Sequence, residues 1–185
     1  MGIDIHVKIV KYNTEDNYYH ELSLYRLRDP DEKIEYNADG EPVNTASPFI
    51  RISPYDCRDY EMFEGMNSES SSEGYGIFPS TTIALGSLEP ELRAEMIKEM
   101  EEIGVYGFQE ISFADLENYL HTHPTVVDFD AEEGENWKGG DPKPQKENPI
   151  KELFESCINY TTFAEKYVWI SAPYSYYKIL FWFDH

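Results

Sequence analysis

The sequence contains little cysteine, and this limits the kinds of site that it can build. Of its 185 residues only two are cysteines, Cys57 and Cys157, and neither belongs to a Cys-x-x-Cys pair. That spacing excludes a disulfide framework and the common structural zinc sites. We expect both cysteines to behave as small buried apolar residues.

Basic residues are also scarce. The chain has 15 lysines and arginines against 36 aspartates and glutamates, which gives a formal net charge of −21. Binding to nucleic acid or to an anionic membrane needs a basic stripe, so we expect neither partner. Three interpretations of the acidic surface stay open: it mimics nucleic acid, it docks a basic protein, or it only maintains solubility.

Long apolar runs and the familiar catalytic motifs are absent. No run reaches the roughly 18 apolar residues of a membrane span, and we expect no signal peptide ahead of the first strand. The chain also lacks GxxxxGK[ST], GxGxxG after a strand, HExxH and GxSxG. These absences exclude, by motif, the standard nucleotide triphosphatases, dehydrogenases, zinc proteases and α/β-hydrolases. We expect a cytoplasmic protein.

The composition and the order of the apolar patterns predict an α+β fold. Hydrophobic residues make up 41% of the chain and aromatics 15%, which is enough for a substantial core. We expect one domain over residues 1–185, with mobile loops near 68–76 and 128–148. Strands are predicted at 3–12, 18–28, 49–52 and 176–183, and helices at 90–103, 113–123 and 149–168. The sheet, antiparallel or mixed, should contain the first and last strands, with about three to four helices packed on it.

The first strand supplies the main site candidates. Its apolar residues alternate with Asp4, His6 and Lys8, so these polar residues share the other face. A carboxylate and an imidazole about 7 Å apart can bind a metal, share a proton or hold a ligand. The alternative is an ordinary solvated strand face.

A metal site would need a third ligand from another element. If the last strand pairs with the first, Asp184 approaches Asp4 and His6, and the sequence then predicts a divalent-metal site of these three residues. The alternative is that Asp184 and His185 only mark a frayed end. His121 and His123 are a second candidate, although histidines near a helix C-terminus also suit the helix dipole.

Arg58 and Tyr60 follow a loop and are predicted to join Asp4 and His6 in binding a ligand. A guanidinium can hold a phosphate or a carboxylate. A local ion pair between Arg58 and Asp56 or Asp59 is the alternative.

Four short segments resemble a family of small uncharacterised proteins encoded by phages, prophages and their bacterial hosts. The opening Met1-Gly2-Ile3-Asp4-Ile5-His6 is similar to the family's MGCDIH start. The segments at 57–63, 85–91 and 181–184 resemble its RNYxLF, RGLP…SPE and VFxFDN segments in the same order. The family's HSHSWL stretch has no counterpart, because Tyr106-Gly107-Phe108-Gln109-Glu110-Ile111 stands there. The resemblance implies a phage or mobile-element setting in a bacterial host, and it implies no established activity.

Three functions remain open, and the sequence does not decide whether the protein is an enzyme. The first is a binding protein that sequesters a small polar ligand, such as a nucleotide, as an accessory protein acting against host defence. The second is an interaction protein whose acidic surface docks a basic host protein. The third is a metal-dependent hydrolase that uses Asp4, His6 and Asp184. The missing histidines make the enzyme less favoured.

Overall fold

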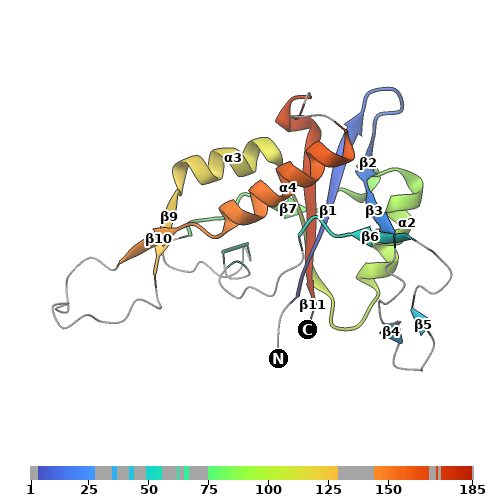
Figure 1. Ribbon diagram of the computed structural model, residues 1–185, viewed down its shortest axis with the longest axis horizontal. Helices are drawn as coiled ribbons and strands as arrows, with labels where there is room; N and C mark the ends of the chain where they lie inside the picture. Colours follow the sequence, from blue (N-terminus) through green and yellow to red (C-terminus); the bar gives the residue numbers. More distant parts are fainter. Residues whose placement is uncertain are drawn as a thin grey trace.

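Figure 1 shows the computed structural model of the chain, which describes residues 4–27, 35–36, 42–43, 49–55, 62, 65–66, 75–128, 144–166, 170 and 172–184. Its strands are β1 (Asp4–Asn13), β2 (Tyr18–Leu22), β3 (Leu24–Leu27), β4 (Glu35–Tyr36), β5 (Pro42–Val43), β6 (Phe49–Ile52), β7 (Thr81–Thr82), β8 (Tyr106–Ser112), β9 (Thr125–Val127), β10 (Gln145–Glu147) and β11 (Tyr177–Asp184). Its helices are α2 (Pro90–Met100), α3 (Phe113–Thr122) and α4 (Ile150–Ala164), with short 3-10 turns at Leu85–Ser87 and Tyr174–Tyr176. The predicted α+β class is confirmed.

The main sheet is antiparallel and has the strand order β2-β1-β11-β8-β7. The first and last strands are neighbours in it, with a register that runs from Asp4 opposite Asp184 to Lys11 opposite Tyr177. This pairing confirms the prediction that one sheet contains the first and last strands. It brings two segments from opposite ends of the sequence to the middle of one sheet.

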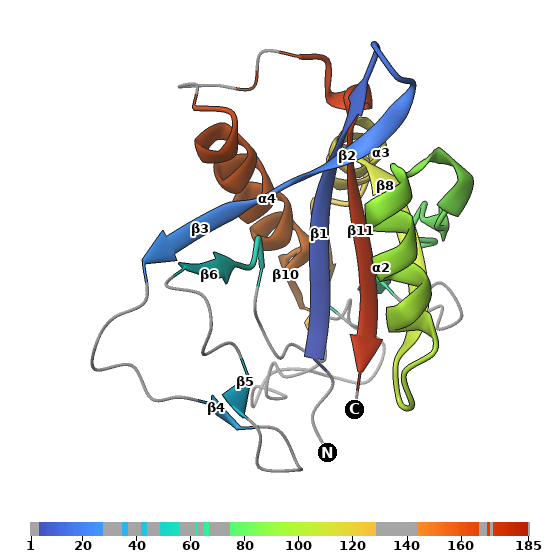
Figure 2. The same ribbon diagram turned by 90° about the vertical axis from the view of Figure 1, so that its right-hand side faces the viewer.

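Both faces of the β1–β11 pair are covered by helices. On one face, Ile5, Val7 and Ile9 pack into a core cluster with α3 and α4, which includes the fully buried Cys157. On the other face, Val10 and Leu180 pack with α2 through Leu92 and Met96 and their neighbours. Figures 1 and 2 show α2 on the opposite side of the sheet from α3 and α4. The polar face predicted for β1 is therefore the α2 side of the sheet, and part of it is buried.

The burial of Cys157 confirms its apolar role, because burial raises the pKa of its thiol. Cys57 lies outside the described residues.

The strand predicted over residues 18–28 is divided in two. β2 pairs with β1 only from Ile9 to Asn13, and the chain then leaves the sheet at Ser23. The backbone N–H of Leu24 donates to the hydroxyl of Tyr160 on α4 at 2.8 Å, and β3 pairs with β6 instead. No described strand covers the β2-side edge of β1 from Asp4 to Lys8.

The helix ends follow local hydrogen bonding. The side chain of Ser112 accepts from the backbone N–H of Asp115 at 3.0 Å and so caps the start of α3. The side chain of Asn148 accepts from the N–H of Ile150 at the start of α4. The predicted end of the helix at residue 103 is wrong, because α2 stops at Met100 and Ile103 is fully exposed beyond it.

Several strands have no clear signal in the sequence. β8 joins the sheet beside β11 although Gly107, at φ +70°, interrupts its pattern. A Cβ at Gly107 would lie 2.6 Å from the ring of Phe183, so the glycine lets that ring pack on the backbone. Residues 145–147, within the loop predicted near 128–148, form β10 and pair with β9. The rest of that loop, residues 129–143, and most of the loop near 68–76 lie outside the described residues.

In the described part of the chain, no helix combines the length and apolar character needed to cross a membrane.

Replacing Phe181 with alanine should lower the free energy of unfolding by about 3–5 kcal/mol, because its ring is fully buried in the central strand. Phe163 on α4 is 73% exposed, so Phe163→Ala should change it by less than about 0.5 kcal/mol. Chemical denaturation of both variants measures the difference. A loss under about 1 kcal/mol for Phe181→Ala would show that β11 is not central to the core.

Candidate functional site

A cavity of about 280 Å³ lies beside the open edge of β1. Two stretches of consecutive residues contribute to its walls, β1 at residues 6–8 and the chain from the end of β6 through Pro54. The remaining walls come from α2 and β11. Its described lining residues are His6, Val7, Lys8, Arg51, Ile52, Ser53, Pro54, Glu95, Glu99 and Trp182. The cavity exists because β2 leaves β1 at Ile9 and no described strand takes its place.

An aromatic stack forms one side of this cavity. The imidazole of His6 stacks on the indole of Trp182 with centroids 5.5 Å apart, and Trp182 stacks in turn on Phe108 at 5.6 Å. His6 and Trp182 are directly opposite each other in the β1–β11 register. Trp182 is buried, whereas the side chain of His6 is 41% exposed. The outer member of the stack is thus accessible at the cavity.

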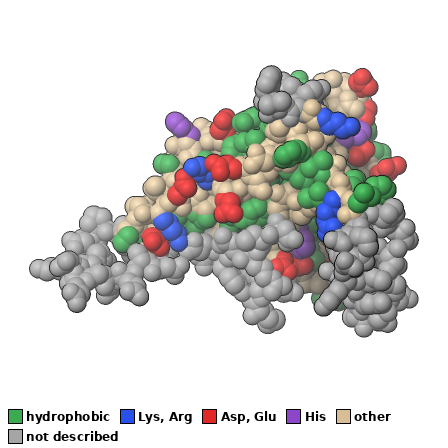
Figure 3. All heavy atoms as spheres, viewed as in Figure 1, with side chains coloured by type: hydrophobic (Ala, Val, Ile, Leu, Met, Phe, Trp, Pro, Cys, Tyr) green, Lys and Arg blue, Asp and Glu red, His purple; other side chains and the backbone are tan. Residues whose placement is uncertain are grey.

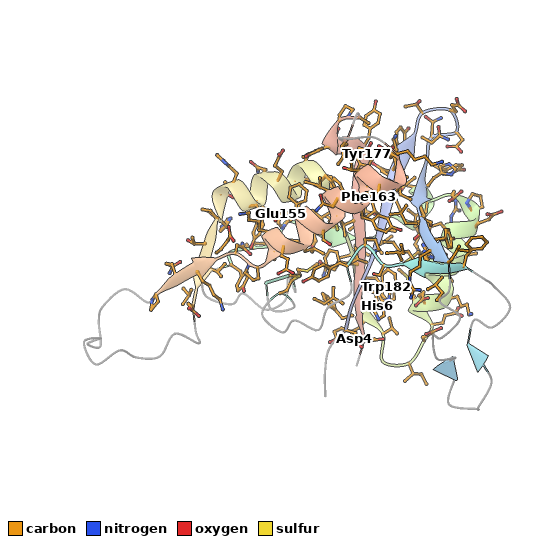
Figure 4. The ribbon with its side chains drawn as sticks, in the orientation of Figure 1. Asp4, His6, Glu155, Phe163, Tyr177 and Trp182 are labelled. Atoms are coloured by element: carbon orange, nitrogen blue, oxygen red, sulfur yellow. The ribbon has the colours of Figure 1, made fainter. Side chains whose placement is uncertain are left out.

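A carboxylate holds the His6 ring from the end of the sheet. Its Nε2 lies 2.9 Å from Oδ2 of Asp184, and Figure 4 shows His6, Trp182 and Asp4 close together where β11 ends. The second oxygen of Asp184 is buried and has no hydrogen-bond partner within the described ranges. The contact fixes the orientation of the imidazole.

An ion network forms the other side. Nζ of Lys8 lies 2.7 Å from Oε1 of Glu95 and 3.4 Å from Oε1 of Glu21. Arg51 contacts the same two carboxylates, with Nη1 at 3.6 Å from Oε1 of Glu95. Lys8 is buried, and this burial lowers the pKa of its ammonium, while the hydrogen bond to Glu95 opposes that shift. Both cations are therefore already neutralised by protein carboxylates.

Glu99 is the carboxylate of the cavity that has no such role. It lies one helical turn after Glu95 on α2. Among the described residues its side chain makes no hydrogen bond or ion pair, although its charge acts on Lys8. Glu99 is thus the group best placed to accept a hydrogen bond from a bound molecule.

The predicted site residues are only partly brought together. His6 lines the cavity, and Asp4 lies two residues before it at the start of β1, opposite Asp184 and outside the described lining. Arg58 and Tyr60 lie outside the described residues. The four-residue ligand site of Asp4, His6, Arg58 and Tyr60 therefore stays a prediction.

Of the predicted metal ligands, His6 and Asp184 are in contact through their side chains. Within the described ranges, no group of three or more His, Cys, Asp or Glu side chains could hold a metal ion. This finding includes Asp4, His6 and Asp184, and His185 lies outside those ranges.

The second histidine candidate fits the helix-end interpretation. The ring of His123 stacks on Tyr119 with centroids 4.9 Å apart, and its Nδ1 lies 3.0 Å from the hydroxyl of Thr122. Asn148 donates to the carbonyl of His123 at 2.9 Å. These contacts join the end of α3 to the start of α4.

Sequence patterning placed Lys8 on the same face as His6 without making it a site candidate, and it did not single out four other residues that line the cavity, namely Arg51, Glu95, Glu99 and Trp182. One signal was available for two of them. Glu95 and Glu99 follow Leu92 and Met96 by three residues each, so they border the apolar stripe of α2. Arg51 gave no signal, because its position depends on the pairing of β3 with β6.

Comparisons of the chain with protein-family models, with curated proteins and with solved structures found no significant match.

The pKa values of two lysines should be shifted in opposite directions. Burial lowers the pKa of Lys8, whereas the hydrogen bond to Glu147 raises that of exposed Lys151, both from an ordinary value of 10.5. As pH rises toward 10.5, folded Lys8 loses its proton before the unfolded chain does, so its contribution to stability increases. The contribution of Lys151 decreases above 10.5, because there the folded state holds the proton longer.

Lysine side-chain NMR in a pH series measures both midpoints, with Lys8→Met and Lys151→Met used to assign the signals. A midpoint for Lys8 at or above that of Lys151 would contradict the burial of the ammonium.

Proposed function

We propose that this protein binds a small polar molecule in the cavity beside the open edge of β1. The observation that carries the proposal is the convergence there of an accessible imidazole, His6, and a carboxylate without an ion-pair partner in the described part of the chain, Glu99. A ring stacked on one side and a hydrogen-bond acceptor on another are what a small aromatic ligand requires.

The charges of the cavity indicate which small molecule suits it. Lys8 and Arg51 are paired with Glu21 and Glu95, so they offer little to a polyphosphate. A carboxylate, by contrast, accepts readily from an amino group, as in recognition of the exocyclic amine of cytosine. The volume of about 280 Å³ is at the small end of ligand sites and suits a nucleobase with its sugar. An amino-bearing nucleoside, or the corresponding part of a nucleotide, fits these features best.

The biological setting is proposed from the resemblance to phage- and prophage-encoded proteins. Binding without chemistry would make the protein an accessory factor that sequesters a signalling nucleotide in the bacterial cytoplasm and so acts against host defence. The hydrolase alternative needs a third metal ligand beside His6 and Asp184, and no suitable group occurs among the described side chains.

Cytidine and uridine make a sharp test, because they differ along one edge of the base: cytidine has an amino group at C4 and an unprotonated N3, whereas uridine has an oxo group at C4 and an N3–H. Isothermal titration calorimetry should show cytidine binding at least about tenfold more tightly than uridine. Glu99→Gln should remove most of this preference, since the neutral amide is a weaker acceptor. His6→Ala should weaken the binding of both nucleosides, because the ring on which the base stacks is lost.

Glu155→Gln, which alters an exposed carboxylate on α4, is the matched control and should leave cytidine binding unchanged. Equal binding of the two nucleosides to the native protein, or equal binding of cytidine to the native protein and Glu99→Gln, would refute the proposal. Absence of binding by both nucleosides would refute the nucleoside assignment.

A further inference from the structure

A second cavity, of about 430 Å³, lies on the outer side of α3 and α4, away from the β1 edge. Its floor is apolar and consists of Leu120 on α3, Pro124 after that helix, and Phe154 and Ile158 on α4. Phe154 is buried, and Leu120 and Ile158 are partly buried against the main core. The floor is thus a fixed part of the fold, open on one side. We call this cavity the α3–α4 groove.

The rim of the α3–α4 groove is dominated by carboxylates. Glu117 lies on α3, Glu147 on β10 and Glu155 on α4, and the rim also carries Lys151 and His121. Figure 3 shows acidic side chains over this face with basic ones among them, and Figure 4 shows Glu155 on α4. Glu147 and Glu155 are 68% and 62% exposed, so they are available to a partner.

Among the described rim residues, the positive charge of Lys151 does not balance the negative charge of the three glutamates. Lys151 contacts both Glu147 and Glu155, with Nζ 3.9 Å from Oε1 of the latter. Its pKa is raised, first by the hydrogen bond to Glu147, as expected where carboxylates outnumber cations. The groove therefore combines an apolar floor with a net negative rim.

We propose that the α3–α4 groove docks a basic segment of a partner protein, with one large apolar side chain seated on Leu120, Phe154 and Ile158 and flanking lysines or arginines facing Glu117 and Glu155. Charge complementarity selects this occupant. The chain carries a net charge of −21, so a second copy would bring like charges together, and a nucleic acid would be repelled.

The geometry also favours a peptide over a small molecule. A groove between two helices is a common place for an amphipathic helix to lay its apolar face, with anchors spaced by helical turns. Exposed rim charges contribute mainly to the rate of association and to specificity, while the apolar anchor determines how long the complex lasts. This division gives each part of the groove its own measurable effect.

The probe is a fluorescein-labelled amphipathic peptide of about four helical turns, with lysines on one face and a central phenylalanine on the other. Fluorescence anisotropy should show saturable binding to the intact chain that weakens as salt rises. The double variant Glu117→Gln/Glu155→Gln should weaken binding about tenfold. Replacing the phenylalanine of the probe with serine should weaken it by a similar or larger factor.

A control double variant, Glu91→Gln/Glu102→Gln, removes two exposed carboxylates at the ends of α2 and changes the net charge by the same amount. It should leave the affinity within about twofold of the native value, because its two carboxylates lie away from the groove. Both double variants reduce the net negative charge equally, so any larger loss in the test variant comes from the rim itself. Equal losses in the two double variants would show non-specific attraction and overturn the proposal. Equal binding of the phenylalanine and serine probes would overturn it as well.

This proposal is independent of ligand binding at the β1 edge. Glu99→Gln should not alter peptide binding, and Glu117→Gln/Glu155→Gln should not alter cytidine binding. Concentration-dependent dimerisation that excludes the probe peptide from the groove would identify a second copy as the occupant and also overturn the proposal.

Discussion

Burial on both faces of the β1–β11 pair is the constraint on which the rest of the structure depends. One face is closed by α3 and α4 and the other by α2, so neither strand has a wholly solvated side. Polar residues on the α2 face must then find partners within the protein. The contacts of Lys8 with Glu21 and Glu95, and of His6 with Trp182 and Asp184, meet this requirement.

The two proposed sites arise from different features of this architecture. At the edge of β1, the sheet is incomplete, and the cavity is small and contains ionic groups that are largely satisfied. On the outer side of α3 and α4, a groove remains between the two helices, with an apolar floor and an acidic rim. The first cavity suits a compact molecule with a ring and an amino group, and the second suits a chain segment with basic side chains. The two sites can be altered separately.

The elements of the fold could be predicted from the sequence where local sequence patterns determine whether a residue is buried and which secondary structure it adopts. The alternation in β1 and the apolar pattern of β11 were enough to predict that one sheet contains the first and last strands. Helical spacing of apolar residues predicted α2, α3 and α4 to within a few residues of their bounds. β8 escaped prediction because its glycine serves the packing of Phe183, a contact between distant segments. For the site, His6 was found from its strand pattern. Lys8, Arg51 and Glu95 converge only through tertiary contacts, which one element's periodicity does not encode.

The position of β11 has a consequence for the order of events during synthesis. β1 is synthesised before β11, which consists of residues 177–184 and is the strand that pairs with β1 on the edge opposite β2. Until those residues leave the ribosome, the apolar side chains of β1 lack the strand that completes their cluster. Contacts of such high sequence separation slow folding, and they expose unpaired strand edges to other chains meanwhile. The abundance of carboxylates along the nascent chain, through mutual repulsion, helps keep those unfinished chains apart.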